Sequence, residues 1–125
     1  MALPIDGGGY FAGNLRAAAF NSIGLYQALI TVTTDTAPVA TVLSNNLGVD
    51  VVWSFVTTGI YRATATGALT ASKTGILLTP DTKGDDTQLA VNHEGANSFL
   101  LYAREGGTLT DDLIAGTYLE IKVFP

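Results

Sequence analysis

His93 is the only histidine in the chain, and Glu94 follows it directly. A hydrolase built on this pair would need a nucleophile on a strained turn such as Gly-x-Ser-x-Gly, and no serine of the chain has that context. A zinc site needs three or four ligands, and one histidine in a chain without cysteine does not supply the usual set. We therefore predict that His93 ends a strand, that Glu94 and Gly95 form the turn after it, and that the chain has no catalytic residues.

The densest acidic stretch is 81–86, with the sequence Asp-Thr-Lys-Gly-Asp-Asp. Carboxylates spaced around a glycine can bind calcium, which prefers hard oxygen ligands. Here, however, Lys83 occupies a ligand position and no glutamate closes the loop. Asp and Gly also suit the dihedral angles of turns, so the stretch is better explained as a turn between strands. We predict no metal site and no cofactor.

Three further patterns have structural explanations that require no ligand. The glycine run at 7–9 lacks the preceding strand, the lysine and the following Ser or Thr of a phosphate-binding loop. Asp111 and Asp112 indicate a turn, or the first turn of a helix capped by Thr110. Arg62 and Arg104 each lie in an expected strand, where pairing with a carboxylate across the sheet is their expected role.

Three aromatic residues, Trp53, Tyr61 and Tyr102, also lie in expected strands. They could form a platform on one sheet against which a sugar stacks. Aromatic residues in strands are more commonly found in a core or an interface, where their large apolar area is removed from water. We favour a core or interface position over the sugar platform.

The elements that must position these residues are β-strands. From residue 25 onward, short runs of β-branched and aromatic residues are separated by turn-forming residues. We expect about eight strands, at 26–34, 38–43, 50–57, 60–66, 75–79, 87–91, 98–104 and 117–124. Such spacing predicts an all-β fold, an antiparallel β-sandwich with a jelly-roll-like arrangement.

Two of these strands allow more specific predictions. In 50–57 both faces are mostly apolar, which indicates an inner strand covered on two sides. In 117–124, Leu119, Ile121 and Val123 alternate with Tyr, Glu, Lys and Phe. Because successive side chains of a strand point to opposite faces, we expect these three residues to face the core.

Residues 1–24 differ in composition from 25–125, which we interpret as the sandwich domain. The first segment has few β-forming residues and is interrupted by glycines. One interpretation is a flexible leader. The other is an extended N-terminal arm that becomes ordered on a neighbouring subunit through four apolar anchors, Tyr10, Phe11, Leu15 and Phe20. The composition alone leaves both open.

The overall composition is apolar and poor in charge. Charged residues make up 14% of the 125 residues, whereas about 25% is usual for a soluble domain. A net charge of −5 without a basic cluster argues against nucleic acid or an anionic membrane as a partner. The chain is either a monomer coated with Thr, Ser, Asn and Gln or a subunit that buries surface against copies of itself. We favour the subunit, because obligate interfaces are apolar and poor in charge.

The part of the chain at about 50–125 resembles a family of short β domains encoded by phages and prophages of Bacteroidetes-type bacteria. The resemblance lies in the strand rhythm and in four stretches, which are Gly59-Ile60-Tyr61, Gly67-Ala68-Leu69-Thr70, Lys73-Thr74 and the ending Gly-Thr-Tyr-Leu-Glu-Ile-Lys-Val-Phe-Pro at 116–125. The first 25 residues do not share it.

Proteins of this kind are virion surface components, such as head fibres, capsid decoration proteins or tail-associated proteins, often trimeric and built on jelly-roll sandwiches. They have no catalytic residues to transfer. The resemblance therefore implies a structural, non-enzymatic virion protein that forms a homotrimer and attaches to a major capsid or tail protein. The alternative is a carbohydrate- or receptor-binding β-sandwich module.

Overall fold

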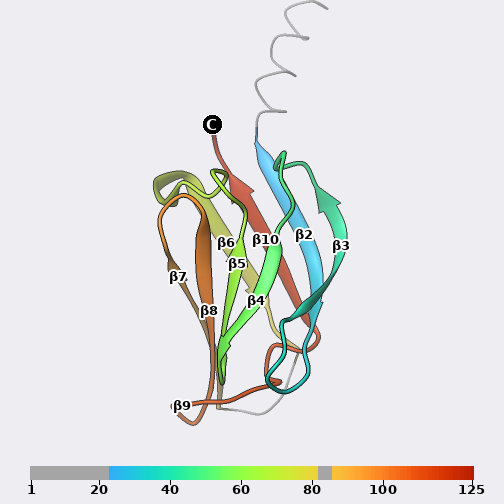
Figure 1. Cartoon of the computed structure of the whole chain (residues 1–125), viewed down its shortest axis with the longest axis vertical. Coiled ribbons are helices and arrows are strands. Elements are labelled where there is room, and N and C mark those ends of the chain that lie inside the picture. Colours follow the sequence, from blue (N-terminus) through green and yellow to red (C-terminus); the bar gives the residue numbers. More distant parts are fainter. Residues whose placement is uncertain (1–22, 82–85) are drawn as a thin grey trace, which may run out of the picture.

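The computed structural model describes residues 23–81 and 86–125, and these residues are almost entirely β-structure (Figure 1). Nine strands form two antiparallel sheets that pack against each other, and the other regular element in the described ranges is a short 3-10 helix at Ala71–Lys73. This architecture confirms the predicted antiparallel β-sandwich of about eight strands.

The first sheet has the strand order β3-β2-β10-β6, and the second has the order β4-β5-β8-β7, with the short β9 paired to β8. The strands of the first sheet are β2 (Gly24–Thr31), β3 (Val39–Asn45), β6 (Thr74–Thr79) and β10 (Thr117–Val123). Those of the second are β4 (Val52–Thr57), β5 (Ile60–Thr64), β7 (Thr87–His93), β8 (Ser98–Glu105) and β9 (Thr108–Leu109). Consequently β3 and β4 are the edge strands on one side of the sandwich, and β6 and β7 are the edge strands on the other (Figure 1).

The inward faces of the two sheets form one apolar core. Thirteen of its residues have no exposed area, and ten of these lie on the strands: Tyr26, Ala28, Ile30, Tyr61, Ala63, Phe99, Leu101, Ala103, Leu119 and Ile121. Burying a large apolar side chain completely contributes about 1.5–3 kcal/mol, so this core is the main source of stability. Leu119 and Ile121 face inward as predicted, and Val123 packs against the same core.

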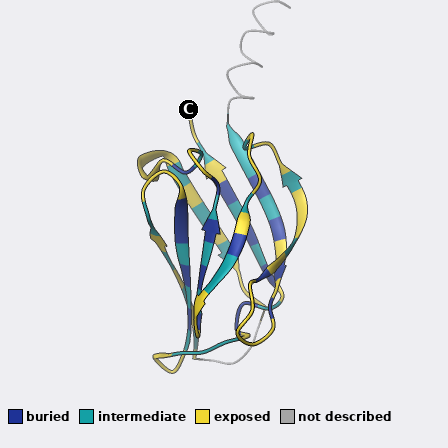
Figure 2. Cartoon of the chain, in the orientation of Figure 1, coloured by how far each residue is buried: buried dark blue, intermediate teal, exposed yellow. Residues whose placement is uncertain are grey.

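Burial alternates along the central strands because only one face of each sheet meets the other sheet (Figure 2). In β5 and β10 every second residue is buried, whereas β3 is exposed along most of its length. The central strands therefore follow the pattern that the sequence predicts.

One prediction about the strands is wrong. The stretch 50–57 was expected to be an inner strand, but β4 lies at the edge of its sheet. Trp53 is 9% exposed and packs edge-to-face on Phe99, with ring centres 6.1 Å apart, whereas Val52 is 61% exposed. The second apolar face of β4 is left open, and apolar residue types alone do not distinguish a covered face from an open one.

Candidate functional site

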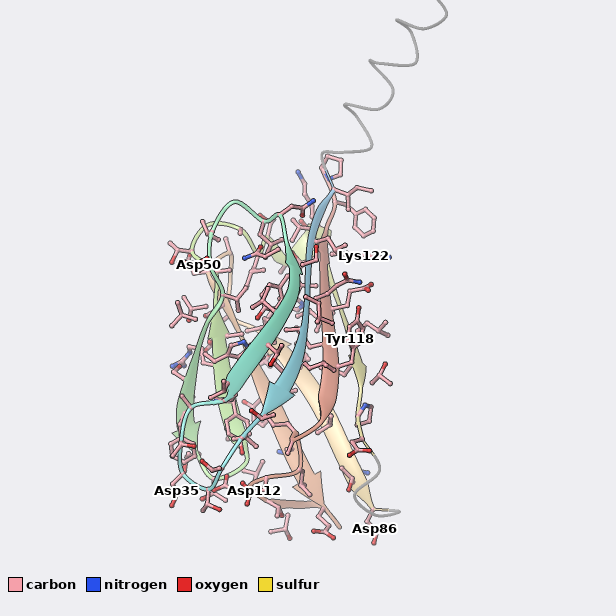
Figure 3. The ribbon with its side chains drawn as sticks, turned by 90° about the vertical axis from the view of Figure 1, so that its right-hand side faces the viewer. Asp35, Asp50, Asp86, Asp112, Tyr118 and Lys122 are labelled. Carbon is pink, nitrogen blue, oxygen red and sulfur yellow. The ribbon has the colours of Figure 1, made fainter. Side chains whose placement is uncertain are left out.

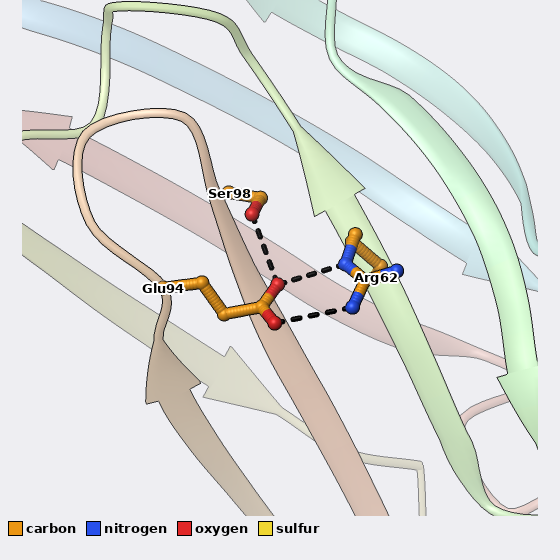
Figure 4. A network of polar contacts seen from close by, with 3 residues as sticks. All are labelled: Arg62, Glu94 and Ser98. Atoms are coloured by element: carbon orange, nitrogen blue, oxygen red, sulfur yellow. Dashed lines mark hydrogen bonds and ion pairs between the residues drawn. The ribbon is translucent and has the colours of Figure 1, made fainter.

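The guanidinium of Arg62 forms a bidentate ion pair with Glu94 (Figure 4). Arg62 Nε and Nη2 donate to the two carboxylate oxygens at 2.8 and 3.1 Å, and Ser98 Oγ donates to Glu94 Oε1 at 2.9 Å. These hydrogen bonds, chiefly those from Arg62, lower the pKa of Glu94, and the same contact raises the pKa of Arg62. The pair ties the turn after β7 to β5, which confirms the carboxylate partner predicted for Arg62.

His93 is the last residue of β7, and the chain turns after Glu94, as predicted. The Nδ1 atom of His93 is buried without a hydrogen-bond partner. The carboxylate of Glu94 is engaged by Arg62 and Ser98. The fold thus uses Glu94 as a structural anchor on the β5 strand.

At one end of the sandwich, Asp111 connects three segments of the chain. Its Oδ1 accepts hydrogen bonds from the Gly59 amide at 2.7 Å and the Tyr61 hydroxyl at 3.2 Å, and its Oδ2 accepts from the Asp35 amide at 3.2 Å. Asp112 next to it accepts a hydrogen bond from Thr34 Oγ1 at 2.9 Å. Asp111 and Asp112 therefore lie in a turn, the first of the two predicted possibilities, and hold the β2–β3 and β4–β5 turns together.

The carboxyls at this end influence one another's ionisation. Partial burial acts to raise the pKa of Asp111, but the hydrogen bonds from Gly59, Asp35 and Tyr61 outweigh it and lower that pKa. The pKa of Asp35 is raised, mainly by its side-chain hydrogen bond with Asp111. Burial, followed by the charge of Asp111, raises the pKa of Tyr61 to about 12. The ionised Asp111 is thus the acceptor of this network.

A second polar network lies on the outer face of the first sheet. Gln27 Nε2 donates to the Tyr118 hydroxyl at 2.7 Å and to Glu120 Oε1 at 3.1 Å, and Lys122 Nζ lies 3.5 Å from Glu120 Oε2. Beside it is an open recess of about 290 Å³, where Gly75 has no side chain to fill the space between its neighbours. The recess is lined by the residues Gly75, Ile76, Leu77, Glu120, Lys122 and Phe124, so it is mainly apolar with one ion pair at its rim.

The partner predicted for Arg104 is wrong. Within the described part of the chain Arg104 has no carboxylate partner, and its guanidinium carbon lies 5.3 Å from the centre of the Tyr102 ring. A cation over an aromatic face is attracted by the negative potential of the ring. Arg104 thus interacts with the ring of Tyr102 in its own strand and not with a carboxylate on a neighbouring strand.

The structure also excludes a sugar-binding platform made of Trp53, Tyr61 and Tyr102 on one face of a sheet. Trp53 and Tyr61 face the core, where they are 9% and 0% exposed, and Tyr102 lies in the register that alternates with buried Leu101 and Ala103. The three aromatic side chains therefore belong to opposite faces of the second sheet. This agrees with the favoured core position for Trp53 and Tyr61.

Two predicted regions lie wholly or partly outside the described residues. They are the arm with its anchors Tyr10, Phe11, Leu15 and Phe20, and most of the acidic stretch 81–86. In the ranges 23–81 and 86–125, no group of three or more His, Asp or Glu side chains is arranged to hold a metal ion. The same ranges contain no helix with the length and apolarity needed to cross a membrane.

The most distinctive surface is one that the sequence did not single out. We call it the β3–β4 side: β3, β4 and the loop at 46–51 between them. Nine large hydrophobic side chains are exposed in the described chain, and six of them lie on this side: Val39, Val42, Leu43, Val49, Val52 and Val56. Their exposed fractions run from 37% to 65%. The available signal was the pair of apolar runs at 39–43 and 51–56, which indicate strands but not which strands form the edges.

The β3–β4 side is also almost free of charge. Between residues 36 and 61 the only charged residue is Asp50. Asp50 lies at one end of this side and Asp35 at the opposite end, so the middle of the surface carries none (Figure 3). An apolar, uncharged surface of this kind is typical of an interface between proteins.

No family model, curated protein or solved structure matches the chain.

Proposed function

We propose that this chain is a non-enzymatic structural subunit of a phage particle, of the capsid decoration, head-fibre or tail-associated type, and that it works as a homo-oligomer. The observation that carries this proposal is the concentration of exposed apolar side chains on one side of a small sandwich, where Asp50 is the single charged residue. Monomeric soluble proteins rarely expose large contiguous apolar patches, because each buried square ångström of apolar surface gains about 25 cal/mol. Self-assembly would remove this surface from water.

The positions of the polar side chains support a structural role. Glu94 is bound by Arg62 and Ser98, and Asp111 by two backbone amides and Tyr61. Each of these groups closes a turn or joins two strands of the sandwich. Their hydrogen bonds favour a rigid scaffold, which is what a component of a particle surface requires.

The resemblance at 50–125 supplies the biological setting of the proposal. It implies a homotrimer on the virion, bound to a major capsid or tail protein. In this scheme residues 1–24 form the arm that attaches the sandwich, with Tyr10, Phe11, Leu15 and Phe20 as its apolar contacts. Aromatic and leucine side chains in a segment interrupted by glycines are suited to binding in this way.

The first test is the mass of the full chain in solution, measured by light scattering over a dilution series. We expect a defined multiple of 13.0 kDa that persists at micromolar concentration. A mass of 13.0 kDa at every concentration would contradict the proposal, because it would mean that the apolar surface stays in water.

The second test is incorporation into particles. Deletion of residues 1–20 should leave the sandwich folded, as judged by its circular dichroism and thermal transition, but should prevent recovery of the protein with purified particles. The matched control is the full-length chain with a single exposed substitution, Gln88→Ala on β7. Normal incorporation of the truncated chain would refute the attachment role of the arm.

A further inference from the structure

We propose that copies of this chain meet along the β3–β4 side, and that β3 of one copy pairs through its backbone with an edge strand on the same side of a second copy. The inference rests on the proposed self-assembly and adds the surface and the mode of contact. It does not depend on whether the assembly belongs to a virion.

The backbone of both edge strands is unpaired on one flank. β3 pairs with β2 alone, and β4 pairs with β5 alone. Unpaired N–H and C=O groups at a sheet edge are a template for another strand, and proteins usually block such edges with charges, prolines or bulges. β3 contains no charged residue and no proline; its one irregularity is a bulge near its end, where Gln27 pairs with Ser44 and Ala28 with Val42. The stretch 39–42 is left as a regular, unprotected edge.

The directions of the side chains favour an added strand over a partner lying flat on one face. Val39 is in register with the outer-face residue Thr31, whereas Val42 is in register with the buried Ala28. Both valines are nevertheless exposed, by 65% and 51%. Apolar side chains therefore project from both faces of β3, and only a strand alongside β3 would contact both sets through cross-strand pairs.

The charge distribution indicates that the added strand comes from a second copy. Each chain carries a net charge of −5, so two copies repel each other wherever carboxylates meet. Carboxyls lie at the two ends of the β3–β4 side, Asp50 at one end and Asp35 with Asp112 at the other, and the uncharged middle lets two copies approach (Figure 3). A basic partner of another kind would instead be recognised by carboxylates along the strand, since charged interfaces are complementary.

The first experiment compares two substitutions of exposed leucines on edge strands. Leu43 on β3 is 56% exposed and Leu77 on β6, on the opposite side, is 54% exposed. Leu43→Lys should weaken self-association at least about tenfold in sedimentation velocity, because lysines on facing copies repel each other and lose the apolar contact. Leu77→Lys, the matched control, should assemble like the wild type. Both should keep the wild-type circular dichroism.

The second experiment maps the contact directly. The chain has no cysteine, so single introduced thiols are unambiguous. Thr41→Cys on β3 should be joined to a second copy by a short bismaleimide, either to itself, which indicates a two-fold β3–β3 contact, or to Ser54→Cys on β4 in a mixture, which indicates a ring of β3–β4 contacts. Leu77→Cys should stay uncross-linked.

These results separate the two proposals. An assembled wild type whose Leu43→Lys variant also stays assembled, or whose cross-links form at Leu77→Cys and not at Thr41→Cys, would overturn the assigned surface and leave self-assembly intact. A wild type that is monomeric at all concentrations would overturn both.

Discussion

The β3–β4 side and the opposite side, formed by β6 and β7, each consist of the two edge strands of the sheets, yet the exposed side chains of the two sides differ. Along β7 the exposed positions are Gln88, Ala90 and Asn92, and Leu77 is the one exposed large apolar residue of β6 and β7. Described charged residues flank these two strands in the sequence, Lys73 and Asp81 at the ends of β6 and Asp86 and Glu94 at the ends of β7, whereas 36–61 has one charged residue, Asp50. Polar groups and charge thus protect one edge of the sandwich.

The few charged residues of the chain are therefore distributed unevenly between the two sides. An edge strand with polar exposed positions and nearby charges is disfavoured as a template for other strands. The β3–β4 side lacks this protection over its whole middle. If the chain were a simple monomer, both edges would need protection, so the difference between them is the basis for assigning self-assembly to one side.

The largest expected effect is a difference in stability between substitutions on the inward face of β4 and substitutions on its outward face. Trp53→Ala should lower the free energy of unfolding by about 3–5 kcal/mol, because it opens a cavity beside Phe99. Val52→Ala at the neighbouring position, which is 61% exposed, should change it by less than about 0.5 kcal/mol. Urea denaturation of dilute samples measures both. Equal losses would mean that β4 is buried on both faces, as the sequence suggested.

A smaller effect should appear at the turn that ends β4. Gly59 has φ +74°, and a Cβ there would lie 2.7 Å from the Thr110 amide nitrogen and 2.8 Å from the Ala103 carbonyl oxygen. Gly59→Ala should therefore cost about 3 kcal/mol from strain and overpacking together. Gly67 has nearly the same φ, +75°, with open space around its Cβ position, so Gly67→Ala should cost about 1 kcal/mol. If Gly67→Ala lowered the stability as much as Gly59→Ala, backbone dihedral strain alone would account for both losses.

The smallest effect should come from removing the charge of Glu94, which directly follows β7. Because the folded state lowers its pKa, its ion pair with Arg62 contributes fully above the ordinary value of 4.5 and is lost as the pH falls through the lowered value. Glu94→Gln should therefore reduce the melting temperature slightly at pH 7, and the difference from the wild type should vanish in strong acid. A difference that is independent of pH would contradict this account. Gln88→Ala, an exposed neutral change on β7, serves as the control.

Most of the strands could be predicted from the sequence, because turn residues and β-branched runs report on local backbone preferences. The stretch 98–104 and β8 differ by one residue, and the alternation of Leu119 and Ile121 correctly located the core face of β10. The two-residue β9 was missed, since it is too short to have a pattern.

The polar contacts of the candidate site were only partly predictable, because they join residues that are far apart in the sequence. A carboxylate partner for Arg62 was expected, but the pattern did not identify Glu94, which follows a strand two places away in the sheet. Arg104 was given the same role and instead lies over Tyr102, because the choice between a ring and a carboxylate depends on which side chains the register brings near. Asp111 was predicted to lie in a turn, and its contacts with Gly59 and Asp35 follow from packing that joins distant turns.

The sequence by itself determined that this chain is an all-β sandwich with little charge, because strand periodicity and composition are local properties. The tertiary structure decided which strands are edges, since the hydrogen bonds that make a strand central or peripheral join residues far apart in the chain. It therefore also decided that the exposed apolar residues gather at β3 and β4. Every apolar side chain favours burial to a similar degree. The order of the strands in the sheets determines which of these side chains are buried within a single copy of the chain and which remain exposed.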